Sequence, residues 1–420
     1  MNKENIKKII ITNAYTWYNK GDAGILLATI DVMKKIYPNA EFNILSFTPE
    51  EDKKRYCKDK SIKNVESNIV NPHPYTHTKL GKLKAIFKLF RQAFSIKFNM
   101  KFNKKGLIIR NKSIKLLNES DLILVCGGGF LGGKKLDSLM HIFQIDIDTQ
   151  FNKPVYILGT SIEPMHNKIV KHFTDKVIKK VDYVFAREEI TENYLKDVLE
   201  KDKHCQIPDM AFALKDENYK FDFIDNYRKE YKIIVGFTVR KWNFPMSNDS
   251  EKASENYIKS ISKTFEHLID KYNALLIFVP QVIVNYANDT DIAKEIKNRV
   301  SKEKRKNIVI REDDWSPYEI KSLISNFDFF IGTRMHSNIF ATSVNVPTLA
   351  IAYEKKTNGI MHDLDLDEYV IDINSIDEKQ LENKVELVIK NREKIVNKLK
   401  IKIPQLREKI QDKIENVMEV

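Results

Sequence analysis

The sequence of 420 residues contains little glycine, proline or cysteine, with 13, 12 and 3 residues respectively. The scarcity of glycine and proline excludes collagen-like and linker-like chains, and it makes any local cluster of glycines informative. The cysteines, Cys57, Cys126 and Cys205, are odd in number and far apart. They therefore predict neither a disulfide framework nor a zinc site, and they fit a reducing cytoplasm.

Long apolar runs are also missing. No run reaches the roughly 18 residues of a membrane span, so no transmembrane helix is expected. The N-terminus lacks the apolar region and cleavage site of a signal peptide, and it indicates the start of a first strand instead. Because 42% of the residues are hydrophobic and 30% are charged, the chain has enough apolar mass for real cores, and its length favours two domains.

One segment has no acidic residue. Between residues 79 and 115 the chain carries twelve Lys and Arg residues, which equals the whole net charge of +12. Because a nucleic-acid binder more often spreads basic residues over its main folded face, no nucleic-acid partner is expected. Six apolar residues of this insert have helical spacing and predict one narrow helix face: Leu80, Leu83, Phe87, Phe90, Phe94 and Phe98.

Basic residues flank that predicted face, namely Lys82, Lys84, Lys88 and Arg91. A basic amphipathic helix with phenylalanines can lie in an anionic membrane interface. The alternative is a helix that packs on the N-terminal domain and leaves its lysines in solvent. Both interpretations remain open at the level of sequence.

The rest of the chain alternates short apolar runs with helical patterns. The predicted strands are residues 8–12, 42–47, 121–125, 155–159 and 183–186 in a first series, and 233–239, 275–279, 307–310, 327–331 and 348–352 in a second. This alternation predicts parallel sheets in an α/β fold with two domains facing a cleft. The predicted segments are an N-terminal domain (1–213), a charged junction (214–232), a C-terminal domain (233–385) and a helical tail (386–420).

Polar residues that follow strands are candidates for a ligand site, because ligands of open parallel sheets bind beyond the carboxyl ends of the strands. Asn19 and Asp22 follow the first strand at the start of a helix predicted for residues 22–36. Asp22 fits a helix N-cap, a general base, or both. Gly127, Gly128 and Gly129 follow the strand at 121–125, where they form either a tight turn or a close approach of backbone to an anionic ligand.

The strongest candidate site is the sequence IGTRMHS at residues 331–337. Arg334 offers a planar fork for carboxylate or phosphate, and His336 can exchange a proton near neutral pH. Both are predicted at a helix N-terminus, which favours anions; the alternative for Arg334 is a buried salt bridge. Four other candidates also follow strands: Arg187, Arg240, Tyr353 and Lys355. The arginines and the lysine among these candidates predict an anionic small-molecule ligand.

These residues resemble the polysaccharide pyruvyl transferase family. The matching pieces are, in order, NKGDAGI, CGGGFLGG, ARE, PDMAF and GTRMHSNIFATSVNVPTLAIAYEKKTNG, and they span roughly residues 8 to 365. The resemblance implies two Rossmann-like domains facing a central cleft, as in glycosyltransferases of the B fold. It implies transfer of the pyruvyl group of phosphoenolpyruvate to a sugar of a cell-surface polysaccharide or its precursor, usually as a ketal.

In that family the Arg and His of the GTRMHS element, here Arg334 and His336, would contact the donor, and Arg240 is a second donor contact. The C-terminal domain is then the donor side and the N-terminal domain the acceptor side. His336 is the candidate acid and Asp22 the candidate base. The scheme requires no metal or cofactor. The expected partners are phosphoenolpyruvate and a free or lipid-linked saccharide, at the inner face of the plasma membrane.

Two other functions fit the same sequence. A glycosyltransferase that uses a nucleotide sugar would have the same fold, and a basic cleft also suits a diphosphate. A catalytically inactive sugar-binding scaffold is the second alternative. The presence of Arg334, His336 and Asp22 argues against the scaffold.

Overall fold

The chain divides into two compact units, each described by itself. A computed structural model describes residues 6–71, 79–133, 138–284 and 287–418. The first unit contains Met1–Trp17, Ile25–Ala213 and Lys409–Val420, and the second contains Tyr18–Gly24 and Leu214–Glu408. The short segment Tyr18–Gly24 therefore belongs with the C-terminal half of the chain, although it precedes most of the first unit.

The first unit is built on a parallel sheet in the order β3-β2-β1-β4-β6-β7-β8, with β5 paired to β6. Its strands are β1 (Lys8–Ala14), β2 (Glu41–Ser46), β3 (Ile62–Ser67), β4 (Leu122–Val125), β5 (Gly128–Gly132), β6 (Val155–Glu163), β7 (Tyr183–Ala186) and β8 (His204–Gln206). All four residues of the central strand β4 are buried, which is typical of a parallel sheet covered on both faces.

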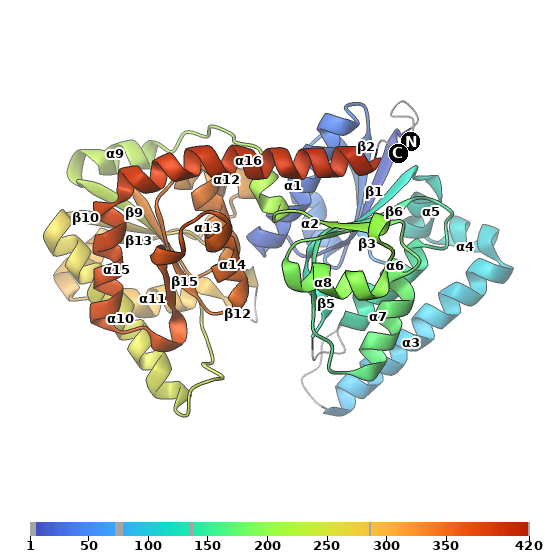
Figure 1. Ribbon diagram of the computed structural model, residues 1–420, viewed down its shortest axis with the longest axis horizontal. Helices are drawn as coiled ribbons and strands as arrows, with labels where there is room; N and C mark the ends of the chain where they lie inside the picture. Colours follow the sequence, from blue (N-terminus) through green and yellow to red (C-terminus); the bar gives the residue numbers. More distant parts are fainter. Residues whose placement is uncertain (1–5, 72–78, 134–137, 285–286, 419–420) are drawn as a thin grey trace. The chain divides into compact units, whose positions relative to one another are not determined.

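Helices connect these strands. They are α1 (Lys20–Ile36), α2 (Pro49–Tyr56), α3 (Lys79–Phe102), α4 (Lys104–Arg110), α5 (Lys112–Glu119), α6 (Ser138–Asp148), α7 (Lys168–Ile178) and α8 (Glu189–Val198). The basic insert forms α3, α4 and α5. The long helix α3 packs along α6 and runs past the edge of the unit (Figure 1).

The second unit has a six-stranded parallel sheet in the order β13-β10-β9-β14-β15-β16. Its strands are β9 (Ile233–Thr238), β10 (Ala274–Phe278), β13 (Ile308–Ile310), β14 (Phe329–Gly332), β15 (Thr348–Ala352) and β16 (Val370–Asp372), and β11 (Ile283–Val284) pairs separately with β12 (Ala287–Asn288). In both sheets the strand order reverses beside the first strand, as in Rossmann folds. The predicted α/β class with two parallel-sheet domains is confirmed.

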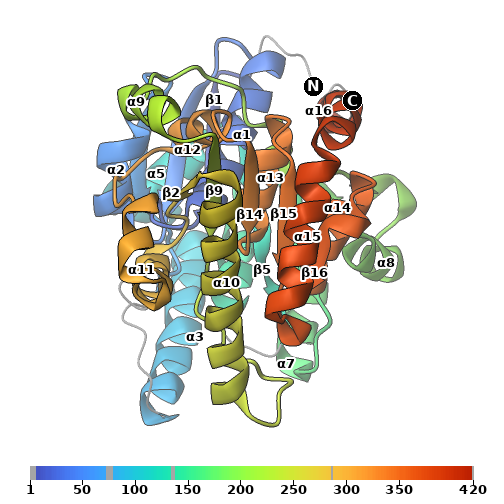
Figure 2. The ribbon, with the colours of Figure 1, turned by 90° about the vertical axis from the view of Figure 1, so that its left-hand side faces the viewer.

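The helices of the second unit are α9 (Asp222–Glu230), α10 (Ser250–Tyr272), α11 (Asp289–Arg299), α12 (Pro317–Ile324), α13 (Met335–Ser343), α14 (Lys355–Asp363), α15 (Glu378–Lys390) and α16 (Arg392–Met418). Figure 2 shows α10 and α15 side by side in front of the sheet, where Glu386 on α15 accepts a hydrogen bond from Tyr272 on α10 (2.6 Å). The last turns of α16, from Lys409, belong to the first unit. None of the helices formed by the described residues is long and apolar enough to cross a membrane.

Candidate active site

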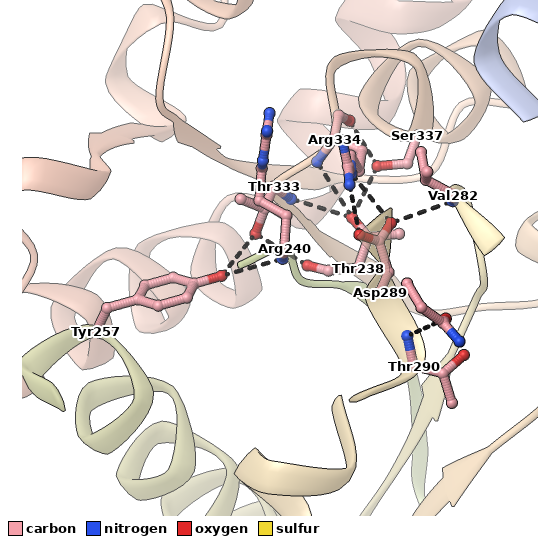
Figure 3. A network of polar contacts seen from close by, with 10 residues as sticks. Thr238, Arg240, Tyr257, Val282, Asp289, Thr290, Thr333, Arg334 and Ser337 are labelled. Atoms are coloured by element: carbon pink, nitrogen blue, oxygen red, sulfur yellow. Dashed lines mark hydrogen bonds and ion pairs between the residues drawn. The ribbon is translucent and has the colours of Figure 1, made fainter. Parts of the chain in front are cut away.

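The candidate site lies where the strand order of the second sheet reverses, at the carboxyl ends of β9 and β14. Thr238 accepts a hydrogen bond at Oγ1 from the backbone N–H of Thr333 (3.0 Å), and the Thr333 hydroxyl donates to the Thr238 carbonyl (3.0 Å). The hydroxyl of Ser337, in the first turn of α13, lies 2.8 Å from that of Thr238. These bonds fix the two loops that carry Arg240 and Arg334 (Figure 3).

Arg334 forms a bidentate ion pair with Asp289, the first residue of α11. Its Nε lies 3.0 Å from Oδ2 of Asp289, and its Nη2 lies 2.5 Å from Oδ1. The Asp289 side chain is buried, and burial raises its pKa, an effect that the Arg334 guanidinium opposes. The salt bridge considered as the alternative for Arg334 is thus present. Because the pair uses only Nε and Nη2, Nη1 remains for another acceptor.

Arg240 lies against two aromatic rings that also contact each other, with 5.0 Å between the ring centres of Trp242 and Tyr353. Its guanidinium carbon lies 4.0 Å from the ring centre of Tyr353 and 4.9 Å from that of Trp242, which are cation–π distances. The charges of Arg240 and Arg334 both act on Asp289 and on Tyr353, so the two arginines are neighbours. The buried Nε of Arg240 has no hydrogen-bond partner among the described residues. The aromatic rings therefore orient Arg240, which forms no ion pair with a carboxylate among the described residues.

His336 lies in the first turn of α13 and packs directly on Gly21. A Cβ atom placed on Gly21 would lie only 2.2 Å from Nδ1 of His336 and 2.8 Å from its Cβ. One turn further on, a Cβ atom on Gly24 would lie 2.6 Å from the ring of Phe340. The two glycines of the NKGDAG sequence thus let the start of α1 approach α13 and place its backbone against the imidazole.

The segment before Gly21 is attached to the rest of the second unit by a backbone hydrogen bond and an ion pair of Lys20. Lys20 donates from its backbone N–H to the Gln281 carbonyl (2.8 Å), and its fully buried ammonium lies 2.7 Å from a carboxylate oxygen of Asp314. Asn19 donates to Asp22 across the first turn of α1 (2.5 Å). Because the helix begins at Lys20, Asp22 lies inside its first turn, and the prediction of Asp22 as the N-cap is wrong.

The structure therefore places six of the predicted site residues in one unit: Asn19, Asp22, Arg240, Arg334, His336 and Tyr353. Lys355 is exposed at the first position of α14, two residues after Tyr353.

Within the described ranges, no group of three or more His, Cys, Asp or Glu side chains could hold a metal ion.

Arg187 and the glycine run belong to the first unit. The buried Arg187 donates to Asp209 (3.0 Å) and, through Nε, to the Ser161 hydroxyl (2.9 Å), so its hydrogen-bonding groups are engaged inside the protein. A Cβ atom on Gly127 would lie 2.1 Å from the Leu158 carbonyl oxygen, so Gly127 is required by close packing against β6. Gly128 has a φ of 147°, and Gly129 is exposed.

Several residues of the site were not singled out from the sequence. Lys20 stands inside the NKGD sequence. Its position directly before a glycine at the start of a helix could have identified it as a candidate site residue. Trp242 lies two residues after Arg240, close enough in the sequence to have been a candidate for a contact with it. Asp314 follows β13 and meets the criterion of a polar residue beyond a strand. Asp289 lies far beyond the end of β10, so only the fold reveals its pairing with Arg334.

The fold of the chain is similar to that of several solved two-domain proteins. It is similar to a putative UDP-N-acetylglucosamine 2-epimerase from Listeria monocytogenes (TM-score 0.60, 12% identity, 97% of this chain and 94% of the other covered). It is also similar to the UDP-GlcNAc 2-epimerase from Neisseria meningitidis (TM-score 0.58, 14% identity, 99% and 100% covered) and to a UGT transferase from Siraitia grosvenorii (TM-score 0.55, 9% identity, 98% and 99% covered). At these identities the likeness shows the fold alone, and it confirms the predicted glycosyltransferase-B-like class.

Sequence comparison gives the family. The model of the polysaccharide pyruvyl transferase family matches residues 19–355, a range that begins at Asn19 and includes Arg240, Arg334 and His336. The chain belongs to the polysaccharide pyruvyl transferase family and is an enzyme of that class, as the sequence motifs predicted. A curated relative is the amylovoran biosynthesis protein AmsJ of Erwinia amylovora, which is 22% identical over 415 residues, covering 95% of this chain and 96% of the relative.

Proposed function

We propose that the enzyme transfers the pyruvyl group of phosphoenolpyruvate to two hydroxyls of a saccharide, forming a ketal. The observation that carries the proposal is Arg240, whose guanidinium lies against the rings of Trp242 and Tyr353 and whose buried Nε has no hydrogen-bond partner among the described residues. A carboxylate or phosphate group completes such a fork with charge-assisted hydrogen bonds. Phosphoenolpyruvate carries both groups.

The neighbouring groups suit the second anionic end of the donor. Arg334 retains Nη1 for an acceptor, while Asp289 holds the rest of its guanidinium in place. The first turn of α13, which begins at Met335, presents the positive end of the helix dipole. Two anionic groups of one small molecule can therefore be bound at once by two arginines and a helix N-terminus.

The reaction then needs one proton donor and one proton acceptor. His336 donates a proton to the methylene carbon of phosphoenolpyruvate, which makes C2 electron-deficient, and a sugar hydroxyl adds to C2 as Asp22 accepts its proton. A second hydroxyl of the same saccharide then adds to C2, the C2–O bond to phosphate breaks, and phosphate leaves with the electron pair and the remaining proton. The products are a cyclic pyruvyl ketal and inorganic phosphate. No residue of the chain changes its oxidation state.

The acceptor in this proposal is a sugar or a lipid-linked saccharide of a polysaccharide pathway. The name of the AmsJ relative, an amylovoran biosynthesis protein, supports a polysaccharide as the final product. We assign the acceptor to the first unit, where Gly129 at the end of the glycine run is exposed. Because Arg187 is already paired with Asp209, its role in this scheme is to hold the loop after β7 in place.

The reaction is proposed to take place in the cytoplasm. Cys57, Cys126 and Cys205 are free thiols, which is the state expected in a reducing compartment. Peripheral contact with the inner face of the plasma membrane is proposed on separate grounds below.

The test is calorimetric binding of phosphoenolpyruvate to the wild type and to Arg240→Gln. Loss of a desolvated arginine–anion contact costs about 2–5 kcal/mol, so affinity should fall roughly thirtyfold or more. Arg311 supplies a matched control, because it also stacks on two aromatic rings, those of Phe223 and Trp315, but is already paired with Asp313. Arg311→Gln should bind phosphoenolpyruvate like the wild type. Equal affinity in the wild type and Arg240→Gln would contradict the proposal.

Donor competition separates this function from glycosyl transfer. The enzyme is incubated with a candidate saccharide and with phosphoenolpyruvate, a UDP-sugar or a GDP-sugar, and the products are identified by mass spectrometry. Pyruvyl addition with release of phosphate is expected only with phosphoenolpyruvate. Transfer of a sugar from a nucleotide would establish the glycosyltransferase instead, and no binding of any donor or saccharide would reject both activities.

A further inference from the structure

The basic insert presents two different faces of α3. One face packs into the first unit, where Leu89, Ala93 and Met100 are buried. Phe90 joins this face and makes edge contacts with Phe143 on α6, at 5.1 Å between ring centres. The grouping of Phe90 with the other phenylalanines in one predicted stripe is therefore wrong, because its side chain belongs to the packed face. The side chains of Leu80 and Leu83 lie outside the described residues.

The other phenylalanines of α3 remain in solvent. Phe87, Phe94, Phe98 and Phe102 are 72%, 73%, 55% and 66% exposed, and we call these four residues the phenylalanine row. They follow one another at intervals of seven, four and four residues, so they share one side of the helix, roughly opposite Leu89 and Ala93. The rings of Phe98 and Phe102 are 4.6 Å apart, and those of Phe94 and Phe98 are 6.5 Å apart. A continuous apolar strip of this kind on a folded surface marks a site of interaction.

Basic residues accompany the phenylalanine row. Lys84, Phe87, Lys88 and Arg91 line a shallow hollow of about 420 Å³ near the start of α3. Among the described residues, neither Lys84 nor Arg91 forms an ion pair, whereas Lys97, nearer the packed face, is paired with Asp146. No acidic residue occurs between residues 79 and 115. Lys84 and Arg91 are therefore available to an external anionic surface.

We propose that the phenylalanine row and its flanking cations dock the enzyme onto an anionic lipid bilayer. Phenylalanine side chains enter the boundary between headgroups and acyl chains, while Lys84 and Arg91 bind lipid phosphates, the hollow beside Phe87 taking one headgroup. A second copy of the chain does not fit the same face, because two such surfaces would bring cations against cations. The packed face of α3 meanwhile keeps the helix attached to the first unit. The docking is independent of the proposed function.

The test is co-sedimentation of the full-length protein with vesicles of phosphatidylcholine alone or mixed with phosphatidylglycerol. The wild type should bind the mixed vesicles at low salt and lose most of that binding at high salt, because the attraction between charges is screened. The double variant Phe94→Ser/Phe98→Ser should reduce the partition coefficient about tenfold or more, since it removes two large apolar groups from the interface. Lys84→Gln/Arg91→Gln should reduce binding at low salt more than at high salt.

A matched control uses exposed apolar residues of the same unit outside the insert. Ile169 and Ile190 are 53% and 54% exposed, and Ile169→Ser/Ile190→Ser should bind vesicles like the wild type. Equal recovery with both kinds of vesicle, or unchanged binding of the Phe94→Ser/Phe98→Ser variant, would overturn the proposal. A concentration-dependent dimer that Phe94→Ser/Phe98→Ser abolishes in ultracentrifugation, with no vesicle binding by the wild type, would assign the row to a protein interface instead.

Discussion

Adding a single methyl group at Gly21 tests how the start of α1 positions His336. In Gly21→Ala the new Cβ would lie 2.2 Å from Nδ1, 2.6 Å from Cγ and 2.8 Å from Cβ of His336. All three distances are shorter than van der Waals contact, and two of the three atoms lie close to the helix backbone. The imidazole cannot avoid the methyl group by rotating its far end alone, so the ring must move.

Two effects on stability oppose each other. Replacing a helical glycine by alanine favours folding by roughly 0.5–1 kcal/mol through chain entropy. Overpacking costs about 1–3 kcal/mol. The net change in the free energy of unfolding should therefore be a loss of about 0–2.5 kcal/mol. Turnover should suffer more if His336 is the proposed general acid, because such a group contributes about 10²–10⁴ in rate and a displaced ring would no longer reach the donor.

The assay combines urea denaturation with steady-state measurement of phosphate release from phosphoenolpyruvate. Gly359→Ala is the first control, because Gly359 is also in a helix of the second unit and a Cβ there meets nothing within 4 Å; it should be slightly more stable and fully active. Gly24→Ala is the second, because its methyl group meets Phe340 instead of His336. It should lose stability as Gly21→Ala does but keep more of its turnover. A fully active Gly21→Ala enzyme would refute this account of the site.

Three further outcomes are expected. Asp289→Asn leaves the partly buried Arg334 without a counter-charge and should lower the free energy of unfolding by about 3–5 kcal/mol in urea titrations; a loss under about 1 kcal/mol would contradict the role given to the pair. Burial raises the pKa of Asp148 to about 7 and lowers that of His141 to about 3. The raised pKa of Asp148 therefore lowers the free energy of unfolding as pH rises from about 4 to 7. The lowered pKa of His141 has the opposite effect between about pH 3 and 6.5. Relative to the wild type, Asp148→Asn should gain on the order of a few kcal/mol of stability as pH rises from about 4 to 7. If the difference in the free energy of unfolding between Asp148→Asn and the wild type does not change with pH, this assignment is wrong. Asp22→Asn should bind phosphoenolpyruvate normally but turn over about 10² times more slowly, measured by phosphate release, and unchanged turnover would leave Asp22 a structural role only.

The central strands of both sheets could be predicted from the sequence because they are continuous apolar runs. The strand at 348–352 was predicted with the bounds that β15 has, and the strand at 183–186 with those of β7. Four strands of the two large sheets were missed, as were the two-residue strands β11 and β12. β3, β8 and β16 lie at sheet edges, and β8 and β16 are short, so they have little apolar pattern. β5 is rich in glycine and forms because it pairs with β6, which local propensity does not reveal.

The candidate site could be predicted only in part, for a similar reason. Arg240, Arg334 and His336 follow strands, and the sheet order brings such residues to one edge. Their partners could not be identified, because pairing between distant residues leaves no local pattern. The Asp289 that binds Arg334, the Asp314 that binds Lys20 and the glycine that admits His336 all depend on packing between segments far apart in the chain.

The membership of Tyr18–Gly24 in the second unit has a consequence for the order of events on the ribosome. The segment is synthesised almost at once, but the residues against which it packs, including Gln281 and His336, are translated only some hundreds of residues later. At typical elongation speeds of about 5–20 residues per second, the segment waits on the order of tens of seconds for its partners. A nascent chain that ends before His336 therefore lacks part of the candidate site, which can assemble only late in translation.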